Sequence, residues 1–552
     1  MTDKKIEIDR TSIPRSYRDY LKKMVEMGEF FEIYDEIDWN LEMGAICRRA
    51  LETGAPSPIF NKVKGCPDGF RAAEVGYQKS GTPGRDWARV AVQLGLPPET
   101  GLMEILHAYN EVMENGKVHP PKIVKNKNAP CKENIWTGDD IDITKFPAPI
   151  AHGGDGGRYI QTVGLNILRT PDGKWTNWST ARAMIANAPA NSKNTMVGSF
   201  SPWAHGGMIH GMWKKEGKDC PIAIAFGAQP AVNINIGTRQ DDYVDEYDAS
   251  SKLLDEPIEL VKCETNDLLV PADAEIILEG MISKDKFLPE GPFGEYPGYQ
   301  FSEHRHLVGM PRIDITAVTF RNDPILPLGL PGVGPDSTQV SISLFSSADV
   351  LAYLKREGFP VIEALITFES GMCWFVIKTK NDWHEITGWR LKEYMDKLGN
   401  ALWGTHYGHL ATKVLVVGED IDPMDPVAVS WAFATRNHPT QGCFYFPELQ
   451  SVGIGPESYH SMADFNLLLM DHDDLVKGNS LVIYSCIGLE EHVGQPKPVQ
   501  LTFERNFPDA IRKKVRANWK KWGLPELNDP KLNPTWKYFS TTGVGETGQR
   551  QR

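Results

Sequence analysis

The sequence lacks the features that mark membrane, secreted and nucleic-acid-binding proteins. No apolar run approaches the ~18 residues of a membrane span, and the amino-terminal M-T-D-K-K-I-E-I-D-R lacks the apolar core of a signal peptide. Lys and Arg form no basic run, and the formal net charge of -13 disfavours binding to phosphate backbones. We therefore expect a cytoplasmic protein without membrane or nucleic-acid partners.

Common cysteine and glycine motifs are missing as well. The eight cysteines are scattered without a C-x-x-C pair, so the sequence predicts neither a zinc site nor a disulfide framework. The Walker loop, the G-x-G-x-x-G turn, the H-E-x-x-H helix and the G-x-S-x-G elbow are all absent. These absences disfavour a P-loop enzyme, a dinucleotide-binding enzyme and a serine hydrolase.

The composition is that of an ordinary globular protein, with 41% hydrophobic and 24% charged residues. The 552 residues are enough for several hydrophobic cores. We expect a mixed α/β fold of three domains: an α/β module over residues 1–130, a β-rich domain over 131–340, and an α/β domain with a mobile tail over 341–552.

The amino-terminal module begins with a helix and a strand. Apolar residues recur at helical spacing from Tyr17 to Val25, Gly28 ends the helix, and a β-rich segment follows. Asn40 then caps a second amphipathic helix that extends through Leu51.

The middle of the chain contains many short β-type runs broken by Gly, Pro and Asn. They include Y-I-Q-T-V-G-L-N-I-L, I-A-I-A-F-G, A-V-N-I-N-I-G, E-I-I-L-E-G-M-I and I-D-I-T-A-V-T-F. Strands at this spacing favour a barrel or a sandwich over a parallel sheet. The last third alternates again, with T-K-V-L-V-V-G as a strand and V-L-A-Y-L-K-R and W-R-L-K-E-Y-M-D-K-L as helices.

The segment E-G-P-F-G-E-Y-P-G-Y-Q, Glu290 to Gln300, holds two carboxylates in a stretch that cannot be a helix. A turn or a bulge has to bring Glu290 and Glu295 together. Two close carboxylates repel each other, and the pKa of one then rises, which suits a proton donor. Residues at the solvated tip of a hairpin are the alternative.

Three further segments carry polar side chains of catalytic or metal-binding type. K-W-T-N-W-S-T-A-R offers the amide oxygen of Asn177 and the guanidinium of Arg182, although a strand with a polar face would look the same. S-P-W-A-H-G-G-M-I-H places His205 beside two glycines, and a structural histidine is the alternative there. The acidic run D-D-Y-V-D-E-Y-D is either a solvated face or the source of one metal-binding carboxylate.

Taken together and in order, these motifs resemble the UbiD family of reversible decarboxylases. The resemblance rests on Y-I-Q-T, W-T-N-W-S-T-A-R, the histidine, D-E-Y, C-E-T-N-D-L-L-V-P and E-G-P-F-G-E, and it is greatest to ferulic or cinnamic acid decarboxylases. Several motifs that agree in order and spacing are more specific than any one of them. The resemblance implies a central split β-barrel that binds prenylated flavin mononucleotide (prFMN), with a carboxy-terminal oligomerisation domain.

The resemblance also implies how the cofactor is held. Asn177, His205 and Glu246 would bind a divalent metal, Mn2+ or Mg2+, that holds the cofactor phosphate. Trp178 would supply a backbone carbonyl to K+, and Lys413 would reach the phosphate.

Two more positions belong to the expected cofactor site. Ala204 stands where the cinnamate enzymes carry a glutamine, and Thr238 ends the segment that takes the place of the family's potassium and phosphate loop.

The catalytic residues implied by the resemblance are Arg182, Glu290 and Glu295. The cofactor would accept the electrons released as carbon dioxide leaves, and Glu295 would donate the proton that replaces the carboxylate. Glu290 and Arg182 would pair, position Glu295 and place the substrate carboxylate.

Tyr296 is the expected substrate-reading residue, because it stands where the cinnamate enzymes carry a methionine. Its hydroxyl can hydrogen-bond a ring hydroxyl or heteroatom, so we expect a substituted benzoate or a heteroaromatic acid as substrate. A flavin prenyltransferase would supply the cofactor, and a homo-oligomer, dimer or hexamer, is expected. A carboxylase or carboxylase subunit, and a catalytically silent flavin-binding scaffold, are the alternatives.

Overall fold

The computed structural model shows two compact units, the first ending at Asp349 and the second beginning at Val350. In the part of the chain that is described, every helix is too short or too polar to cross a lipid bilayer. The described residues are 6–187, 192–200, 204–238, 242–300, 309–403, 412–446, 481–495 and 500–524.

The predicted helix and strand at the amino terminus are confirmed as α1 (Tyr17–Glu26) and β1 (Phe30–Ile33). Ser16 caps α1, because its hydroxyl oxygen accepts the N–H of Asp19 at 3.0 Å. The apolar face of α1 is buried in a small core with Phe30 of β1.

The second predicted helix is confirmed as α2 (Glu42–Thr53), but Asn40 as its cap is wrong. Leu41 is the residue before the helix, and no side chain caps it. The reason is local: the Glu42 carboxylate accepts the N–H of Asp38 at 2.8 Å, and the Asp38 carboxylate accepts the N–H of Asn40 at 2.9 Å. These acidic side chains order the chain before α2 instead of Asn40.

A four-stranded sheet in the order β1-β2-β3-β16 packs with these helices. Its last strand, β16 (Ile325–Leu328), lies more than two hundred residues further along the chain than its partner β3. The sheet of the amino-terminal region is therefore completed by a strand from the middle of the sequence. Other elements here are β2 (Ser57–Phe60), β3 (Arg71–Glu74), α3 (Ala88–Gln93), α4 (Leu102–Asn115), β4 (Lys122–Ile123), β12 (Glu259–Lys262) and β13 (Leu269–Pro271).

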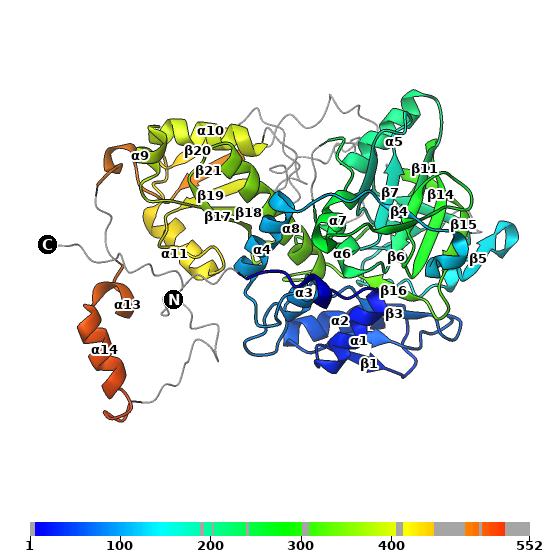
Figure 1. The fold of residues 1–552 in the computed structure, drawn as a ribbon, viewed down its shortest axis with the longest axis horizontal. Coiled ribbons are helices and arrows are strands. Elements are labelled where there is room, and N and C mark those ends of the chain that lie inside the picture. Colours follow the sequence, from blue (N-terminus) through cyan, green and yellow to red (C-terminus); the bar gives the residue numbers. More distant parts are fainter. Residues whose placement is uncertain are drawn as a thin grey trace. The chain divides into compact units, whose positions relative to one another are not determined.

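A nine-stranded sheet forms the centre of the first unit, in the order β6-β9-β10-β15-β14-β11-β7-β8, with β5 paired to β15 (Figure 1). All of its neighbouring strands are antiparallel. Its strands are β5 (Asn134–Thr137), β6 (Tyr159–Gln161), β7 (Leu165–Arg169), β8 (Thr176–Ser179), β9 (Ala183–Ile185), β10 (Thr195–Gly198), β11 (Cys220–Phe226), β14 (Ile276–Leu288) and β15 (Met310–Phe320).

The sheet has to curl, because β8 and β9 lie near its opposite ends although only three residues separate them. The chain from Ser179 to Ala183 spans at most about 14 Å. The Asn166 amide donates to the carbonyl of Ala181 in this connection at 3.0 Å. We call Thr180–Arg182 the seam, since it joins the two ends of the curled sheet.

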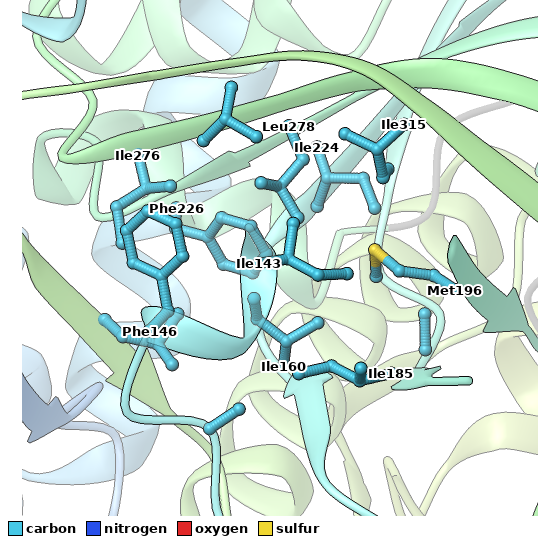
Figure 2. Close-up of a cluster of buried hydrophobic side chains, with 14 of the residues drawn as sticks. Ile143, Phe146, Ile160, Ile185, Met196, Ile224, Phe226, Ile276, Leu278 and Ile315 are labelled. Atoms are coloured by element: carbon cyan, nitrogen blue, oxygen red, sulfur yellow. The ribbon is translucent and has the colours of Figure 1, made fainter. Parts of the chain in front are cut away.

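The inside of the curled sheet is filled with apolar side chains (Figure 2). Ile224 of β11, Leu278 of β14 and Ile315 of β15 meet Phe146 from the preceding loop region in one buried cluster. The mixed α/β fold with a curled, strand-rich centre is thus as expected.

One predicted strand, A-V-N-I-N-I-G, is wrong, because these residues form α6 (Pro230–Asn233) and a 3-10 turn, η6 (Ile234–Ile236). Pro230 starts the helix, where its missing N–H costs nothing. The amides of Asn233 and Asn235 donate to the nearby carbonyls of Ala228 and Val232 at 2.9 and 3.0 Å. These local bonds satisfy backbone groups that a strand would pair with a neighbour.

Three longer helices complete the first unit. Helix α5 (His205–Lys215) packs on β7, β8, β11 and β14, and α7 (Tyr247–Leu254) packs on α4 and α6. Helix α8 (Ser337–Arg356) leads into the second unit.

The second unit has a mixed five-stranded sheet in the order β17-β18-β19-β21-β20, which confirms the predicted strand and helix alternation. The pairs β18-β19 and β19-β21 are parallel. Its elements are β17 (Val361–Ile366), β18 (Trp374–Thr379), α9 (Trp383–Thr387), α10 (Leu391–Trp403), β19 (Lys413–Val417), α11 (Pro426–Arg436), β20 (Cys443–Phe446), β21 (Leu481–Ser485), α13 (Phe503–Asn506) and α14 (Asp509–Asn518).

Candidate active site

Arg182, Glu290 and Glu295 meet at one end of the seam. The Arg182 guanidinium donates from Nε to Glu290 Oε1 at 2.8 Å and from Nη2 to Oε2 at 3.0 Å. Its Nη1 donates to Glu295 Oε1. One arginine therefore binds both predicted carboxylates, the first of them through two parallel hydrogen bonds.

This acid cluster is shielded from water, with side-chain exposures of 11% for Arg182, 0% for Glu290 and 10% for Glu295. The alternative of a solvated hairpin tip is therefore wrong for both glutamates. Burial by itself lowers the pKa of the Arg182 guanidinium, but the two carboxylates outweigh it and raise that pKa well above its usual value. Arg182 thus stays charged.

A tight turn brings the second glutamate to the arginine. The N–H of Glu295 donates to the carbonyl of Tyr299, and the N–H of Gly298 donates back to the carbonyl of Glu295, each at 2.9 Å. Between the two acids, Phe293 places its ring 5.2 Å from the Arg182 guanidinium. The segment holds its carboxylates on one side, as the Gly and Pro residues predict.

Tyr159 of β6 also binds the acid cluster. Its hydroxyl donates to Glu290 Oε1 at 2.6 Å, and its ring lies 4.4 Å from that of Phe293. Burial, followed by the nearby Glu290 charge, raises the pKa of Tyr159 well above its usual value, so its phenol keeps the proton that it donates. Y-I-Q-T is one of the motifs that resemble the family, but the motif alone indicates no role for Tyr159.

Asn177, His205 and Glu246 form a second cluster beside β8, which we call the donor trio. The Asn177 amide donates to Glu246 Oε1. His205 Nδ1 lies 3.4 Å from Asn177 Nδ2 and 3.5 Å from Glu246 Oε1. Three residues from β8, the start of α5 and the residue before α7 therefore meet at one point.

The donor trio is buried and contains one carboxylate with a neutral amide and an imidazole. Burial raises the pKa of Glu246, and its bonds to His205 and to the N–H of Trp178, the latter 2.8 Å long, offset this only in part. On its other side the His205 ring bonds Asp242 through Nε2 at 2.9 Å. Asp242 lies in the acidic run D-D-Y-V-D-E-Y-D, but nothing in the sequence distinguishes it from the other acidic residues of that run.

The remaining predicted site residues lie around these clusters or in the second unit. Ala204 is the cap of α5, directly before His205, and Thr238 follows η6, which packs on β8. Trp178 Nε1 and the Thr180 hydroxyl are buried without a hydrogen-bond partner in the described part of the chain. Tyr296 is half-buried, and its carbonyl accepts the Gln339 amide.

Lys413 begins β19 of the second unit, where its strand pairs with β18 and β21. Its expected contact with a cofactor phosphate therefore stays a prediction.

The two clusters suit different chemistry. The acid cluster can donate or accept a proton beside a fixed positive charge, which suits a reaction at a carboxylate. The donor trio offers amide and carboxylate oxygen and imidazole nitrogen, a set that suits Mn2+ or Mg2+. Among the described residues no group of three or more His, Cys, Asp and Glu forms a further metal site.

Comparison with known proteins gives the family. Family models match over most of the chain, as 3-octaprenyl-4-hydroxybenzoate carboxy-lyase amino-terminal domain over residues 21–109, Rift-related domain over 122–334 and carboxy-terminal domain over 339–465. The chain is 32% identical to pyrrole-2-carboxylic acid decarboxylase of Pseudomonas aeruginosa and 32% identical to ferulic acid decarboxylase 1 of Saccharomyces cerevisiae. Each match covers 92% of this chain and 98% of the relative.

Solved structures agree with this assignment. Vanillic acid decarboxylase of Sedimentibacter hydroxybenzoicus shares the fold, with a TM-score of 0.76 and 22% identity over 93% of this chain and 99% of that one. The UbiD-class enzyme HmfF of Pelotomaculum thermopropionicum, in complex with prFMN, gives a TM-score of 0.68 and 25% identity over 90% and 99%. The chain belongs to the UbiD family of carboxy-lyases.

Proposed function

We propose that this protein catalyses the reversible, non-oxidative decarboxylation of an aromatic or heteroaromatic carboxylic acid with prFMN as cofactor. The observation that carries the proposal is the sharing of one buried arginine by two glutamates, Arg182 with Glu290 and Glu295. Relatives along nearly the whole chain are decarboxylases of pyrrole-2-carboxylic and ferulic acids, and a structural neighbour binds prFMN.

The residues present fit the metal that would hold such a cofactor. Glu246 is a buried carboxylate that lies beside the Asn177 amide and the His205 imidazole, and burying a charge without a counter-ion is costly. A divalent cation on Asn177, His205 and Glu246 would remove that cost. Mn2+ or Mg2+ at these three residues would hold the cofactor phosphate, together with K+ at the Trp178 carbonyl. Thr238 and Lys413 would contact the same phosphate, and Ala204 would lie beside it.

Two orphaned polar groups also favour a ligand beside the seam. The Trp178 indole N–H and the Thr180 hydroxyl are buried without a partner in the described part of the chain, and such groups usually bond something. When bound, prFMN supplies an electrophilic ring that takes up the electron pair released with carbon dioxide.

The residues of the acid cluster then have distinct tasks. Arg182 attracts the substrate carboxylate and holds Glu290 through two hydrogen bonds, and the Tyr159 hydroxyl also donates to Glu290. Glu295 donates its proton to the ring carbon that loses the carboxylate. Tyr296, the next residue, reads the ring substituent. We retain the domain boundaries near residues 130 and 340 and a homo-oligomeric state as part of this proposal.

Co-expression with a flavin prenyltransferase, followed by a panel of aromatic acids, tests the proposal. We expect bound flavin, bound manganese and carbon dioxide release from one or more substituted benzoates or heteroaromatic acids. Pyrrole-2-carboxylic, ferulic and vanillic acids belong in the panel, because relatives of known structure or sequence act on them. Bound flavin without carbon dioxide release from any acid would contradict the enzyme and favour a scaffold.

A further inference from the structure

A glycine-rich turn that the proposed reaction does not use packs against the acid cluster. It is His152–Asp155, in the sequence H-G-G-D, and it contacts the Glu290–Gln300 segment at several points. Directly after the turn, the N–H of Gly156 donates to the carbonyl of Pro292 at 2.8 Å. The turn and the glutamate segment are therefore fastened together along their length.

Asp155 makes the central contacts, and its side chain is fully buried. Its Oδ1 accepts the N–H of Gly294 and the side-chain amide of Gln300, each at 3.0 Å. Its Oδ2 accepts the N–H groups of His152 and Ala151 at 2.9 and 3.2 Å. Four donors thus fill the carboxylate, and one of them belongs to the residue next to Glu295.

His152 holds Asp155 from the other side. Its Nδ1 lies 3.1 Å from Asp155 Oδ2, and its Nε2 lies 2.8 Å from the carbonyl of Pro331. A carbonyl only accepts, so Nε2 carries a proton. The Asp155 carboxylate already accepts four N–H groups, so Nδ1 has to donate to it as well. The hydrogen bonds therefore require His152 to be doubly protonated.

The packing leaves no space between the two segments. A Cβ on Gly294 would lie 2.5 Å from His152 Nδ1, and a Cβ on Gly156 would lie 1.7 Å from the carbonyl oxygen of Gly291. Only glycine fits at these two positions. The glycines of both segments thus permit the hydrogen bonds that Asp155 makes.

The two catalytic glutamates are held differently. Arg182 binds both side chains. In addition, Tyr159 holds the Glu290 side chain, whereas Asp155 holds the backbone next to Glu295 by accepting the N–H of Gly294. We propose that Asp155, oriented by His152, is a positioning residue that keeps the Glu295 carboxyl in place for proton transfer. This inference rests on the proposed function and adds to it the device that aligns the proton donor.

The first test replaces Asp155 with Asn, which keeps one acceptor oxygen but turns an N–H2 toward backbone N–H groups. We expect kcat to fall at least about tenfold, because small displacements of reacting groups cost rate, with little change in KM or in bound flavin. Amide hydrogen exchange of the Glu290–Gln300 segment, measured on the full chain without cofactor, should become faster. Asp425→Asn is the control, since Asp425 also accepts two backbone N–H groups but lies in the second unit.

Gln300→Ala is the milder second variant, because it removes one donor to Asp155 and leaves the N–H bond of Gly294 in place. It should shift exchange and kcat in the same direction by less. This variant decides the case if Asp155→Asn does not fold.

The pH profile separates positioning from general loss of structure. The charged groups that face His152 are Asp155 on its own turn and Arg48 of α2, while the facing glutamates are bound by Arg182. Burial lowers the pKa of His152, but the bond to Asp155 outweighs it, and the net pKa is raised. The Nδ1 bond is therefore present at lower pH and lost as pH rises through that raised pKa, and kcat should fall there.

His152→Asn should abolish this alkaline fall in kcat, because its amide N–H donates near the position of Nδ1 at any pH. If amide hydrogen exchange of the Glu290–Gln300 segment were unchanged in Asp155→Asn and Gln300→Ala, Asp155 would not hold this segment in place. That conclusion would apply whether or not the chain is a decarboxylase. Faster exchange with an unaltered kcat would overturn the positioning role. An activity panel that fails for the unmodified protein would instead overturn the proposed function, and the exchange experiment would still decide the fastening.

Discussion

The acid cluster and the donor trio lie on the two sides of the same three-residue seam, yet they balance charge in opposite ways. In the acid cluster, two buried carboxylates share one guanidinium. In the donor trio, the buried carboxylate of Glu246 meets the amide of Asn177 and the imidazole of His205. The first cluster contains its own counter-ion, whereas under the proposed function a divalent cation would complete the second.

This difference in charge balance suits the two clusters to different tasks. A preformed ion pair costs no reorganisation during a reaction, so the acid cluster suits proton transfer and carboxylate binding. A carboxylate without a guanidinium retains affinity for a metal, because the metal relieves the cost of its burial. Under the proposed function, the reacting group and the group that anchors the cofactor lie only five positions apart in the sequence, at Arg182 and Asn177.

Replacing Glu295 with Gln gives the largest expected effect on activity. Gln keeps the shape and can still bond Arg182, but it has no proton to donate, so kcat should fall by about 10²- to 10⁴-fold. Flavin and manganese, measured by absorbance and elemental analysis, should stay bound. Glu29→Gln is the matched control, since Glu29 is also buried against an arginine, Arg89, at 3.0 Å. Full carbon dioxide release by Glu295→Gln would remove Glu295 as the proton donor.

Replacing Arg182 with Met tests whether the acid cluster is balanced by that arginine alone. Two buried carboxylates would lose their counter-ion, and breaking a buried pair in this way costs roughly 3–5 kcal/mol of stability. The melting temperature of the metal-free protein should drop clearly. Arg89→Met removes a second buried arginine that is paired with a glutamate and provides a comparison for stability. A melting temperature equal to that of the unmodified protein would show that Arg182 does not balance the cluster.

Replacing Glu246 with Gln should have the opposite effect on the metal-free protein. The change removes an unbalanced buried charge, so stability without metal should stay the same or rise slightly. Manganese binding, titrated by electron paramagnetic resonance, should weaken by at least about 10- to 100-fold, the loss that even an outer partner of a metal ligand causes. Glu290→Gln should leave manganese binding intact. Equal manganese affinity in Glu246→Gln and the unmodified protein would contradict the donor trio as the metal site.

Much of the fold could be predicted because its signals are local. The periodicity of α1, the alternation of β15 and the apolar strand β19 each lie within a few turns or one strand. The strand prediction for A-V-N-I-N-I-G was wrong for a related reason. Its β-branched residues favour a strand, but hydrogen bonds from its asparagine side chains to the local backbone outweigh that preference. Strand β16 joins the amino-terminal sheet by pairing with β3, which is distant in the sequence, so no local pattern could predict this pairing.

The site was predicted mainly by the order of its motifs. Taken alone, the segment with Asn177 and Arg182 could be a strand with a polar face, and only the resemblance of the whole set of motifs indicated their partners. The structure places Asn177 beside Glu246 and Arg182 beside Glu290. Tyr159, Asp155 and Asp242 were missed, because each acts on a motif residue that is distant in sequence or lies in an unremarkable acidic run. The glycines around Asp155 were the one available signal, since a charged residue among glycines often marks close packing of two backbones.

Glu74 offers a smaller test of the same physics in a buried carboxylate away from both clusters. Burial raises its pKa to about 7, although the Ser337 hydroxyl and the N–H of Gly76 bond it. Between the ordinary glutamate pKa of 4.5 and the raised pKa of about 7, the folded protein holds a proton that the unfolded chain has released, so stability falls as pH rises through this window.

Glu74→Gln removes this titration, because an amide stays neutral. The melting temperature of Glu74→Gln relative to the unmodified protein should therefore rise between about pH 5 and about pH 8, by an amount equivalent to roughly 2–3 kcal/mol. Glu36→Gln, an exposed carboxyl paired with Lys62, should show no such trend. If the melting temperatures of Glu74→Gln and the unmodified protein changed in parallel with pH, Glu74 would be charged in the fold, and burial would not suffice to keep this carboxyl protonated.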